Sequence, residues 1–139
     1  MINKIGVLTS GGDAPGMNAA IRGVTRYAIQ KGLTVEGIIR GYEGLLSHET
    51  RPLGRRDVGA IIHRGGTMLR TARCLEFKEK ETQKKAAAYL RELEIDALVV
   101  VGGDGSMRGA QALSRWGIPT ITIPGTIDND MMGTQYTLG

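Results

Sequence analysis

The sequence predicts an α/β protein built as a doubly wound, Rossmann-like three-layer sandwich around a mainly parallel sheet. Short apolar runs recur along the chain, each followed by a glycine-rich loop and then by apolar residues at helical spacing. The run at residues 97–101 has no polar break, which is typical of a strand buried on both faces of a parallel sheet. Sheets of this kind bind ligands at the carboxyl ends of their strands, so we expect the glycine loops to form the functional site.

Composition narrows the class of protein. The chain has 139 residues, enough for one domain with its own core, and 41% of them are hydrophobic against 23% charged. A net charge of +4 favours anionic ligands, but the few aromatic residues are too scattered to stack bases, so we expect no nucleic-acid partner. Cys74 is the single cysteine, which excludes an intrachain disulfide. No run reaches membrane-spanning length and no signal-peptide pattern occurs, so we expect a cytoplasmic protein without a membrane partner.

The first unit is a strand at residues 5–8, a glycine loop at 9–16 and a helix that follows. The loop narrowly misses a P-loop, because Met17 and Asn18 stand where Lys and Ser or Thr are required. It offers backbone N–H groups to a phosphate, while the positive charge must come from elsewhere. On the helix, the apolar stripe is formed by Met17, Ala20, Ile21, Val24 and Ala28.

Arginines are the candidates for that positive charge. Arg22 and Arg26 lie four residues apart, opposite the apolar stripe, and their spacing alone favours a solvated face. Arg70 and Arg73 follow a glycine pair, and either could serve the first loop, although a lone arginine is more often a surface residue. Cys74 has no neighbouring base, so its thiol is expected to be inert.

The middle of the chain is less regular. Residues 33–39 predict the second strand, and residues 41–44 are rich in turn formers. The polar stretch 48–56 reads as a surface connection, and residues 58–63 as a short helix. Composition predicts a further helix over 79–93, ahead of the strand at 97–101.

The loop after that strand reads Gly102-Gly103-Asp104-Gly105-Ser106 and leads into a helix from Ser106 that ends at residues 117–119. Three glycines let the backbone approach an anion closely, and the helix adds the positive end of its dipole. Asp104 would repel a phosphate unless a divalent cation lies between them, so the loop predicts a Mg-nucleotide site. The alternative is an ordinary strand-turn-helix connection capped by Asp or Ser.

A third loop, at residues 124–130, follows the strand at 120–123. Asp128 and Asp130 are two apart, so in extended chain both side chains face one site, and Thr126 shares that face. Either carboxylate could take a proton from an attacking hydroxyl. Converging at one sheet edge, the three loops would supply what phosphoryl transfer needs, although an Asx-rich turn remains the alternative for the third.

These residues carry a resemblance to the bacterial 6-phosphofructokinases. The matching motifs are residues 5–22, 65–67 with 72–73, 102–106 and 124–130, and the likeness covers all 139 residues in order. The GGDG loop alone would be weak evidence for this family, because NAD kinases and diacylglycerol kinases also carry such a loop. The combination of motifs is specific.

The resemblance implies a phosphotransferase of glycolysis that moves the γ-phosphoryl of ATP to the 1-hydroxyl of fructose 6-phosphate, giving fructose 1,6-bisphosphate and ADP. It implies Mg²⁺ on Asp104. The residues implied to contact ATP are Gly12, Arg73, Cys74, Gly103, Asp104, Gly105 and Ser106.

The same resemblance implies roles in the third loop. Asp128 would be the general base, Thr126 would touch the transferring phosphoryl, and Asp130 would support the metal shell. Thr126, Ile127 and Asp128 would contact the sugar substrate. Diphosphate-using relatives carry Asp and Lys where this chain has Gly105 and Gly125, so the two glycines indicate an ATP enzyme.

Regulation and assembly are also implied. Arg22, Arg26 and Arg55 match the family's effector site, where ADP activates and phosphoenolpyruvate inhibits. Ala60 replaces the usual acidic residue of that site, which alters the expected effector response. The family forms homotetramers from chains more than twice this long, with a sugar-phosphate pocket drawn from the second half and a neighbouring subunit.

We therefore expect residues 1–139 to be most of a truncated ATP-binding lobe that binds MgATP weakly and has no useful kinase activity alone. A non-catalytic nucleotide-binding module is the alternative. Intact Asp104, Thr126 and Asp128 argue against it, because a module freed from catalysis has no chemical need for a base.

Overall fold

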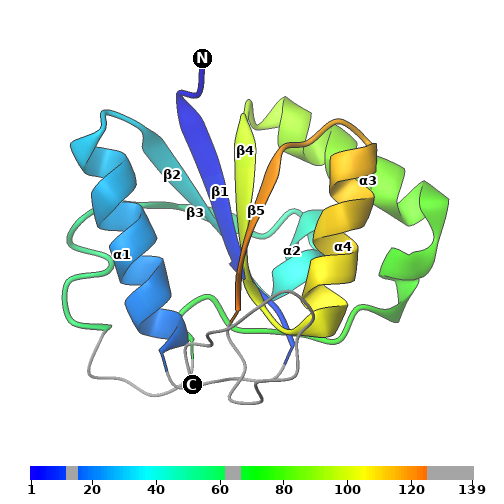
Figure 1. The fold of residues 1–139 in the computed structure, drawn as a ribbon, viewed down its shortest axis with the longest axis horizontal. Coiled ribbons are helices and arrows are strands. Elements are labelled where there is room, and N and C mark those ends of the chain that lie inside the picture. The colour runs from blue at the N-terminus through cyan, green and yellow to red at the C-terminus, as the bar shows by residue number, and fades with distance from the viewer. Residues whose placement is uncertain (12–15, 62–66, 125–139) are drawn as a thin grey trace.

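The computed structural model describes residues 1–11, 16–61 and 67–124 and places a five-stranded sheet between layers of helices (Figure 1). The strand order is β3-β2-β1-β4-β5; β3 is antiparallel to β2 and every other pair is parallel. The predicted α/β class with a mainly parallel sheet is confirmed. The strands are β1 (Lys4–Thr9), β2 (Thr34–Ile38), β3 (Thr50–Leu53), β4 (Ala97–Gly102) and β5 (Thr120–Pro124).

Helices cover both faces of the sheet. One face carries α1 (Met17–Gln30), which packs on β1 and β2. The other carries α2 (Gly41–Ser47), α3 (Lys80–Glu92) and α4 (Asp104–Arg115), with α3 packed against both of its neighbours (Figure 1). A 3-10 turn at Leu75–Lys78 leads into α3. The predicted three-layer arrangement is therefore present.

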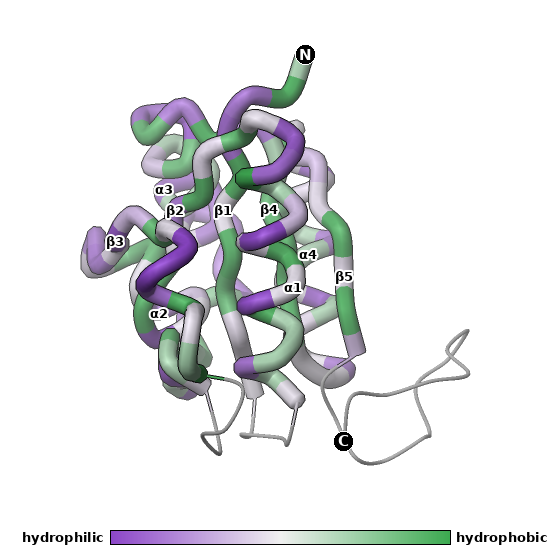
Figure 2. The backbone as a smooth tube through the Cα atoms, turned by 90° about the vertical axis from the view of Figure 1, so that its left-hand side faces the viewer, coloured by the Kyte–Doolittle hydropathy of each residue, from purple (hydrophilic) through white to green (hydrophobic). Residues whose placement is uncertain are grey.

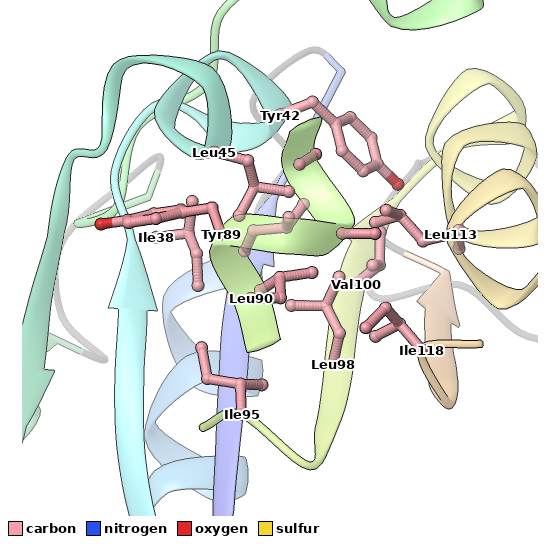
Figure 3. Close-up of a cluster of buried hydrophobic side chains, with 14 of the residues drawn as sticks. Ile38, Tyr42, Leu45, Tyr89, Leu90, Ile95, Leu98, Val100, Leu113 and Ile118 are labelled. Carbon is pink, nitrogen blue, oxygen red and sulfur yellow. The ribbon is translucent and has the colours of Figure 1, made fainter. Parts of the chain in front are cut away.

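Alternating side chains of the strands divide the core between the two faces. From β4, Leu98 and Val100 join the cluster beneath α2, α3 and α4, whereas Ala97 and Val99 join the cluster beneath α1. Figure 3 shows the first cluster, in which Leu90 of α3 lies over Leu98. This strand is buried along its whole length, as its unbroken apolar run predicts.

Two segments differ from the predictions made for them. Residues 41–44, predicted as turn, begin helix α2; a Cβ on Gly44 would collide with the backbone oxygen of Ile39, so glycine is required there by packing. The stretch predicted as a surface connection contains strand β3. Its Pro52 is tolerated because β3 is an edge strand and pairs on one side only.

Two helix predictions also need correction. Helix α4 begins at Asp104, two residues before the predicted start, since Gly103 is its N-cap. Of the helix predicted over 58–63, residues 58–60 lie in turns, and the part from residue 62 lies outside the described residues. The remaining predicted helices and strands occur with ends shifted by a few residues at most.

The two edges of the sheet differ in their side chains. On β3, Arg51 and Pro52 are exposed, and Arg51 forms an ion pair of 2.7 Å with Asp57. On β5, Ile121 is 59% exposed and the neighbouring Thr122 is exposed too. In the view of Figure 2, no helix of the described residues lies in front of β5. Within the described ranges, no helix is both long and apolar enough to cross a membrane.

Candidate functional site

The topology creates one switch point, between β1 and β4. From β1 the chain turns through α1 to β2 on one side, and from β4 it turns through α4 to β5 on the other. The carboxyl ends of β1, β4 and β5 point to the same edge (Figure 1). A crevice at such a point is where open α/β sheets bind ligands, so the predicted convergence of the loops after these strands is supported by the strand order.

The β1 and β4 loops touch each other at this edge. The Ser10 amide donates to the Val101 carbonyl at 2.9 Å, which continues the strand pairing into the loops. A Cβ on Gly102 would lie 2.6 Å from the Ser10 oxygen and 2.7 Å from the Ser106 Cβ. Only glycine therefore fits at position 102.

The next glycines have a different environment. A Cβ on Gly103 or on Gly105 would meet no heavy atom within 4 Å, so packing within the described chain does not require glycine at either position. No side chain in the described part of the chain caps α4, and the first turn carries an exposed acid, Asp104. Among the described residues, nothing covers this helix N-terminus or accepts from its first N–H groups, an arrangement that suits an anion.

Ser106 lies at the inner side of the same turn. Its hydroxyl oxygen is buried and has no hydrogen-bond partner within the described part of the chain, which is costly unless another group supplies one. The Tyr42 hydroxyl donates to the Ser106 carbonyl at 2.5 Å, and the Tyr42 ring stacks on Phe77 at 4.4 Å between centroids. Tyr42, whose pKa is raised by burial, ties α2 to the start of α4 (Figure 3).

A second group at the edge is the segment 67–74. The Thr9 hydroxyl lies 2.9 Å from the Thr67 hydroxyl and donates to the Arg70 carbonyl at 3.0 Å. The side-chain oxygen of Asn18 accepts from the Met68 amide at 2.6 Å. Arg70 has a left-handed backbone with φ 61°. The segment after β3 is thereby tied to both ends of the β1–α1 loop.

Arg73 and Cys74 follow directly. Arg73 is exposed and Cys74 half-buried. Burial, with a smaller contribution from Glu43, raises the pKa of the Cys74 thiol to about 11, so it is protonated at neutral pH. This agrees with the expectation of an inert thiol.

The three predicted effector arginines do not lie on the switch-point loops. Arg26 and Arg55 are exposed. Arg22 is half-buried, and its Nε is buried without a hydrogen-bond partner among the described residues. The prediction of an exposed face is therefore right for Arg26 and only partly right for Arg22, because buried Asn18 and Thr25 extend the inner side of α1 beyond the predicted apolar stripe.

Several predicted site residues lie outside the described residues. They are Gly12, Gly125, Thr126, Ile127, Asp128 and Asp130. Strands β1 and β5, which precede these loops, are described and end at the switch-point edge. Their roles stay predictions.

Asp104 is the carboxylate for which the sequence predicts a bound Mg²⁺. Among the described residues, no three His, Cys, Asp or Glu side chains group together, so no all-protein cage is present in that part of the chain. Asp104 is exposed, and its side chain takes part in no ion pair or hydrogen bond within the described ranges. Mg²⁺ is commonly held by one or two carboxylates together with nucleotide phosphates, and this donor set fits Asp104.

A surface pocket lies away from this edge. It opens on the outer side of α2 and α3 and is lined by Leu45, His48, Lys85, Tyr89 and Glu92, among others. His48 stacks on Tyr89 with ring centroids 3.9 Å apart. None of the predicted site residues lines this pocket, so it is separate from the candidate site.

Sequence reasoning did not single out Thr9, Asn18 or Tyr42. Two of these residues stand out in their local setting. Thr9 is a polar residue at the end of an apolar strand, and Asn18 is a buried amide in the first turn of a helix. Tyr42 sits in a segment that was predicted as turn, so its burial could not be foreseen.

Comparisons with known proteins agree with the geometry. The Phosphofructokinase family matches residues 4–139. The chain is 58% identical over 138 residues to "ATP-dependent 6-phosphofructokinase 1" of Clostridium perfringens. It is 62% identical over 139 residues to "ATP-dependent 6-phosphofructokinase" of Caldanaerobacter subterraneus. Each match covers 99% of this chain and 43% of the relative, so the chain spans less than half the length of these curated relatives.

A solved structure extends the likeness to the fold. The crystal structure of Pichia pastoris phosphofructokinase in the T-state superposes with a TM-score of 0.93 at 40% identity, covering 100% of this chain and 17% of that one.

Proposed function

The chain belongs to the phosphofructokinase family, and we propose that the full-length protein containing it is an ATP-dependent 6-phosphofructokinase. It transfers the γ-phosphoryl of MgATP to the 1-hydroxyl of fructose 6-phosphate. Residues 1–139 form most of the ATP-binding lobe, which alone binds MgATP weakly and does not turn over. The names of the 58% and 62% identical relatives support this activity.

The proposal rests on the geometry of the β4–α4 loop. Gly102 is fixed by packing, whereas Gly103 and Gly105 face open space at an uncapped helix N-terminus. Donors that the described chain leaves unused suit an anionic ligand, and nucleotide phosphates are such a ligand.

Each residue of the proposed site has its own role in phosphoryl transfer. The backbone N–H groups of the α4 N-terminus, including that of Ser106, hold phosphate oxygens, and Gly12, Arg73 and Cys74 contact the rest of the nucleotide. Asp104 holds Mg²⁺, which when bound neutralises charge on the phosphates. Asp128 accepts the proton of the attacking 1-hydroxyl, as a general base must.

Three further residues of the third loop complete the site. Thr126 contacts the transferring phosphoryl, Ile127 the sugar substrate, and Asp130 supports the metal shell. Specificity for ATP over diphosphate rests on Gly105 and Gly125. The open space around Gly105 supports the first half of that assignment, because nothing in the described chain occupies the place where a larger side chain would stand.

Regulation and assembly follow the family resemblance. The proposal includes a cytoplasmic homotetramer with an effector site for ADP and phosphoenolpyruvate at Arg22, Arg26 and Arg55. The exposure of Arg26 and Arg55 supports this, since both side chains are free to reach an anion or a neighbouring subunit. Ala60, also exposed, stands where the family has an acidic residue, so the strength or the identity of the effector is expected to differ.

The test is an assay of the full-length protein with MgATP and fructose 6-phosphate. Asp128→Ala should lower kcat by at least about 100-fold while leaving ATP binding nearly unchanged. Asp104→Ala should raise the Mg²⁺ concentration needed for half-maximal rate. Asp96→Ala is the matched control. Asp96 lies just before β4, at the amino ends of the parallel strands and away from the candidate site, where it accepts from the Asn3 and Lys4 amides.

Two outcomes would contradict the assignment. Near-normal kcat in Asp128→Ala would remove Asp128 from the role of base, and an unchanged Mg²⁺ titration in Asp104→Ala would remove the metal role. A wild-type protein that binds MgATP without turnover would be a nucleotide-binding module.

A further inference from the structure

The segment 67–70 is held by a chain of hydrogen bonds whose proton order can be assigned. The Arg70 carbonyl can only accept, so the single hydroxyl hydrogen of Thr9 is used in that bond at 3.0 Å. Thr67 must then donate to Thr9 across 2.9 Å. The remaining lone pairs of Thr67 accept the Leu69 amide at 3.2 Å. Each hydroxyl therefore donates once and accepts once, and the chain is complete.

Other contacts pin the same segment. The Asn18 oxygen accepts from the Met68 amide at 2.6 Å, and the Leu69 carbonyl accepts from the Arg40 amide at 2.8 Å. The Leu69 side chain is fully buried in the cluster beneath α1. Thr9 and Asn18 lie on either side of the β1–α1 loop, so this loop and the segment are joined at both of the loop's ends.

We propose that Thr9 and Asn18 are positioning residues that fix segment 67–70 and so orient Arg73 toward the nucleotide. The inference rests on the proposed function, because it takes Arg73 as an ATP contact. Arg73 is exposed and follows the pinned segment by three residues, so its approach depends on where Arg70 is held. Thr9 is fully buried, and its side-chain hydrogen bonds within the described chain go to Thr67 and Arg70, so removal of its hydroxyl acts directly on the segment.

The decisive experiment is a double-mutant cycle in the full-length protein. Thr9→Val keeps the shape of the side chain and removes both of its hydrogen bonds. We expect it to raise the KM for MgATP about 10-fold, a change of about 1.4 kcal/mol, with the KM for fructose 6-phosphate unchanged. In the Arg73→Ala background, Thr9→Val should add less than about 2-fold, since coupled residues are not additive.

Two control variants separate the loss of the Thr9 hydrogen bonds from a general destabilisation of the fold. Thr9→Ser restores a hydroxyl and should return the KM to within about 3-fold of wild type. Thr25→Val makes the same substitution at another fully buried threonine, whose hydroxyl has no hydrogen-bond partner among the described residues. It should leave the KM within about 2-fold.

Amide hydrogen exchange provides a readout independent of activity. Thr9→Val should accelerate exchange of the Leu69 amide about 10-fold, because its acceptor Thr67 is no longer anchored. Equal losses from Thr9→Val in the Arg73 and Arg73→Ala backgrounds, or an unchanged KM, would overturn the proposal. If the wild type has no turnover, the proposed function fails, and unchanged exchange at Leu69 would then overturn the positioning role on its own.

Discussion

The contrast between Gly102 and Gly103 gives a prediction that separates stability from binding. The substitutions Gly102→Ala and Gly103→Ala each add one methyl group to adjacent residues of the same loop. At position 102 the new Cβ would lie 2.6 Å from the Ser10 oxygen, below the 3.0 Å that real Cβ contacts respect, so the backbones must separate by about 0.4 Å. The Ser106 hydroxyl lies closer still and is enclosed.

The two groups that the new Cβ would meet are both held in place. The Ser10 oxygen belongs to backbone held by the bond from the Ser10 amide to Val101, and Ser106 belongs to the first turn of α4, so neither group moves freely. Overpacking of this kind costs about 1–3 kcal/mol, and two rigid neighbours favour the upper end. Gly103 has φ −102° and ψ −157°, extended backbone that any residue adopts, and its surroundings are open. Gly103→Ala should therefore change the free energy of unfolding by no more than about 1 kcal/mol.

Nucleotide binding should show the opposite order. The methyl group of Gly103→Ala enters the space in front of the α4 N-terminus, so MgATP affinity should fall by about 10-fold or more. Urea titration of the full-length protein without nucleotide measures the first effect, and equilibrium titration with a fluorescent ATP analogue and Mg²⁺ measures the second. Wild-type affinity in Gly103→Ala would refute the phosphate-binding role of the loop. Wild-type stability in Gly102→Ala would refute the close approach of β1 and α4.

Three further predictions concern titration and burial. Amides of Asn3 and Lys4 hold the pKa of Asp96 below its usual value. Because the folded-state pKa is the lower one, this stabilisation is complete above about pH 5 and is lost as the pH falls through the depressed pKa. The difference in unfolding free energy between wild type and Asp96→Ala should shrink below about pH 4 in urea titrations; a constant difference would contradict the reasoning. Burial raises the pKa of Cys74 to about 11, so its alkylation rate should keep rising about tenfold per pH unit beyond pH 9, whereas an unperturbed thiol levels off near pH 8.5. Thr25→Val should leave the unfolding free energy unchanged or raise it by about 1 kcal/mol, because the buried hydroxyl lacks a partner in the described chain; a clear loss in thermal unfolding would reveal one.

The parts of the fold that follow from local pattern were predictable. The run 97–101 is apolar because β4 is buried on both faces, and the spacing of Met17, Ile21 and Ala28 places α1 against the sheet. The glycine loops could be assigned to one edge because parallel strands share a direction. The use of Gly103 for a ligand and Gly102 for packing could not be separated, since both are glycines in one motif and only their neighbours in space differ.

The failures have physical causes as well. Gly41 and Gly44 suggested a turn, yet Gly44 is needed where α2 packs close to the Ile39 backbone. The polar stretch 48–56 suggested a surface connection, yet it contains strand β3, in which Pro52 is tolerated because β3 is an edge strand. Thr9 was passed over because its partners Thr67 and Arg70 are about 60 residues away, and no local pattern shows such a contact.

The two edges of the sheet have different consequences for the chain in solution. Natural sheets protect their edges with proline, charge or cover, and β3 has the first two in Pro52 and Arg51. Strand β5 carries no charge, and its proline, Pro124, is only its last residue. Ile121 is 59% exposed, and the flanking threonines favour extended chain. Within residues 1–11, 16–61 and 67–124, β5 is an edge strand that pairs on one side only, so this edge is a template for strand addition.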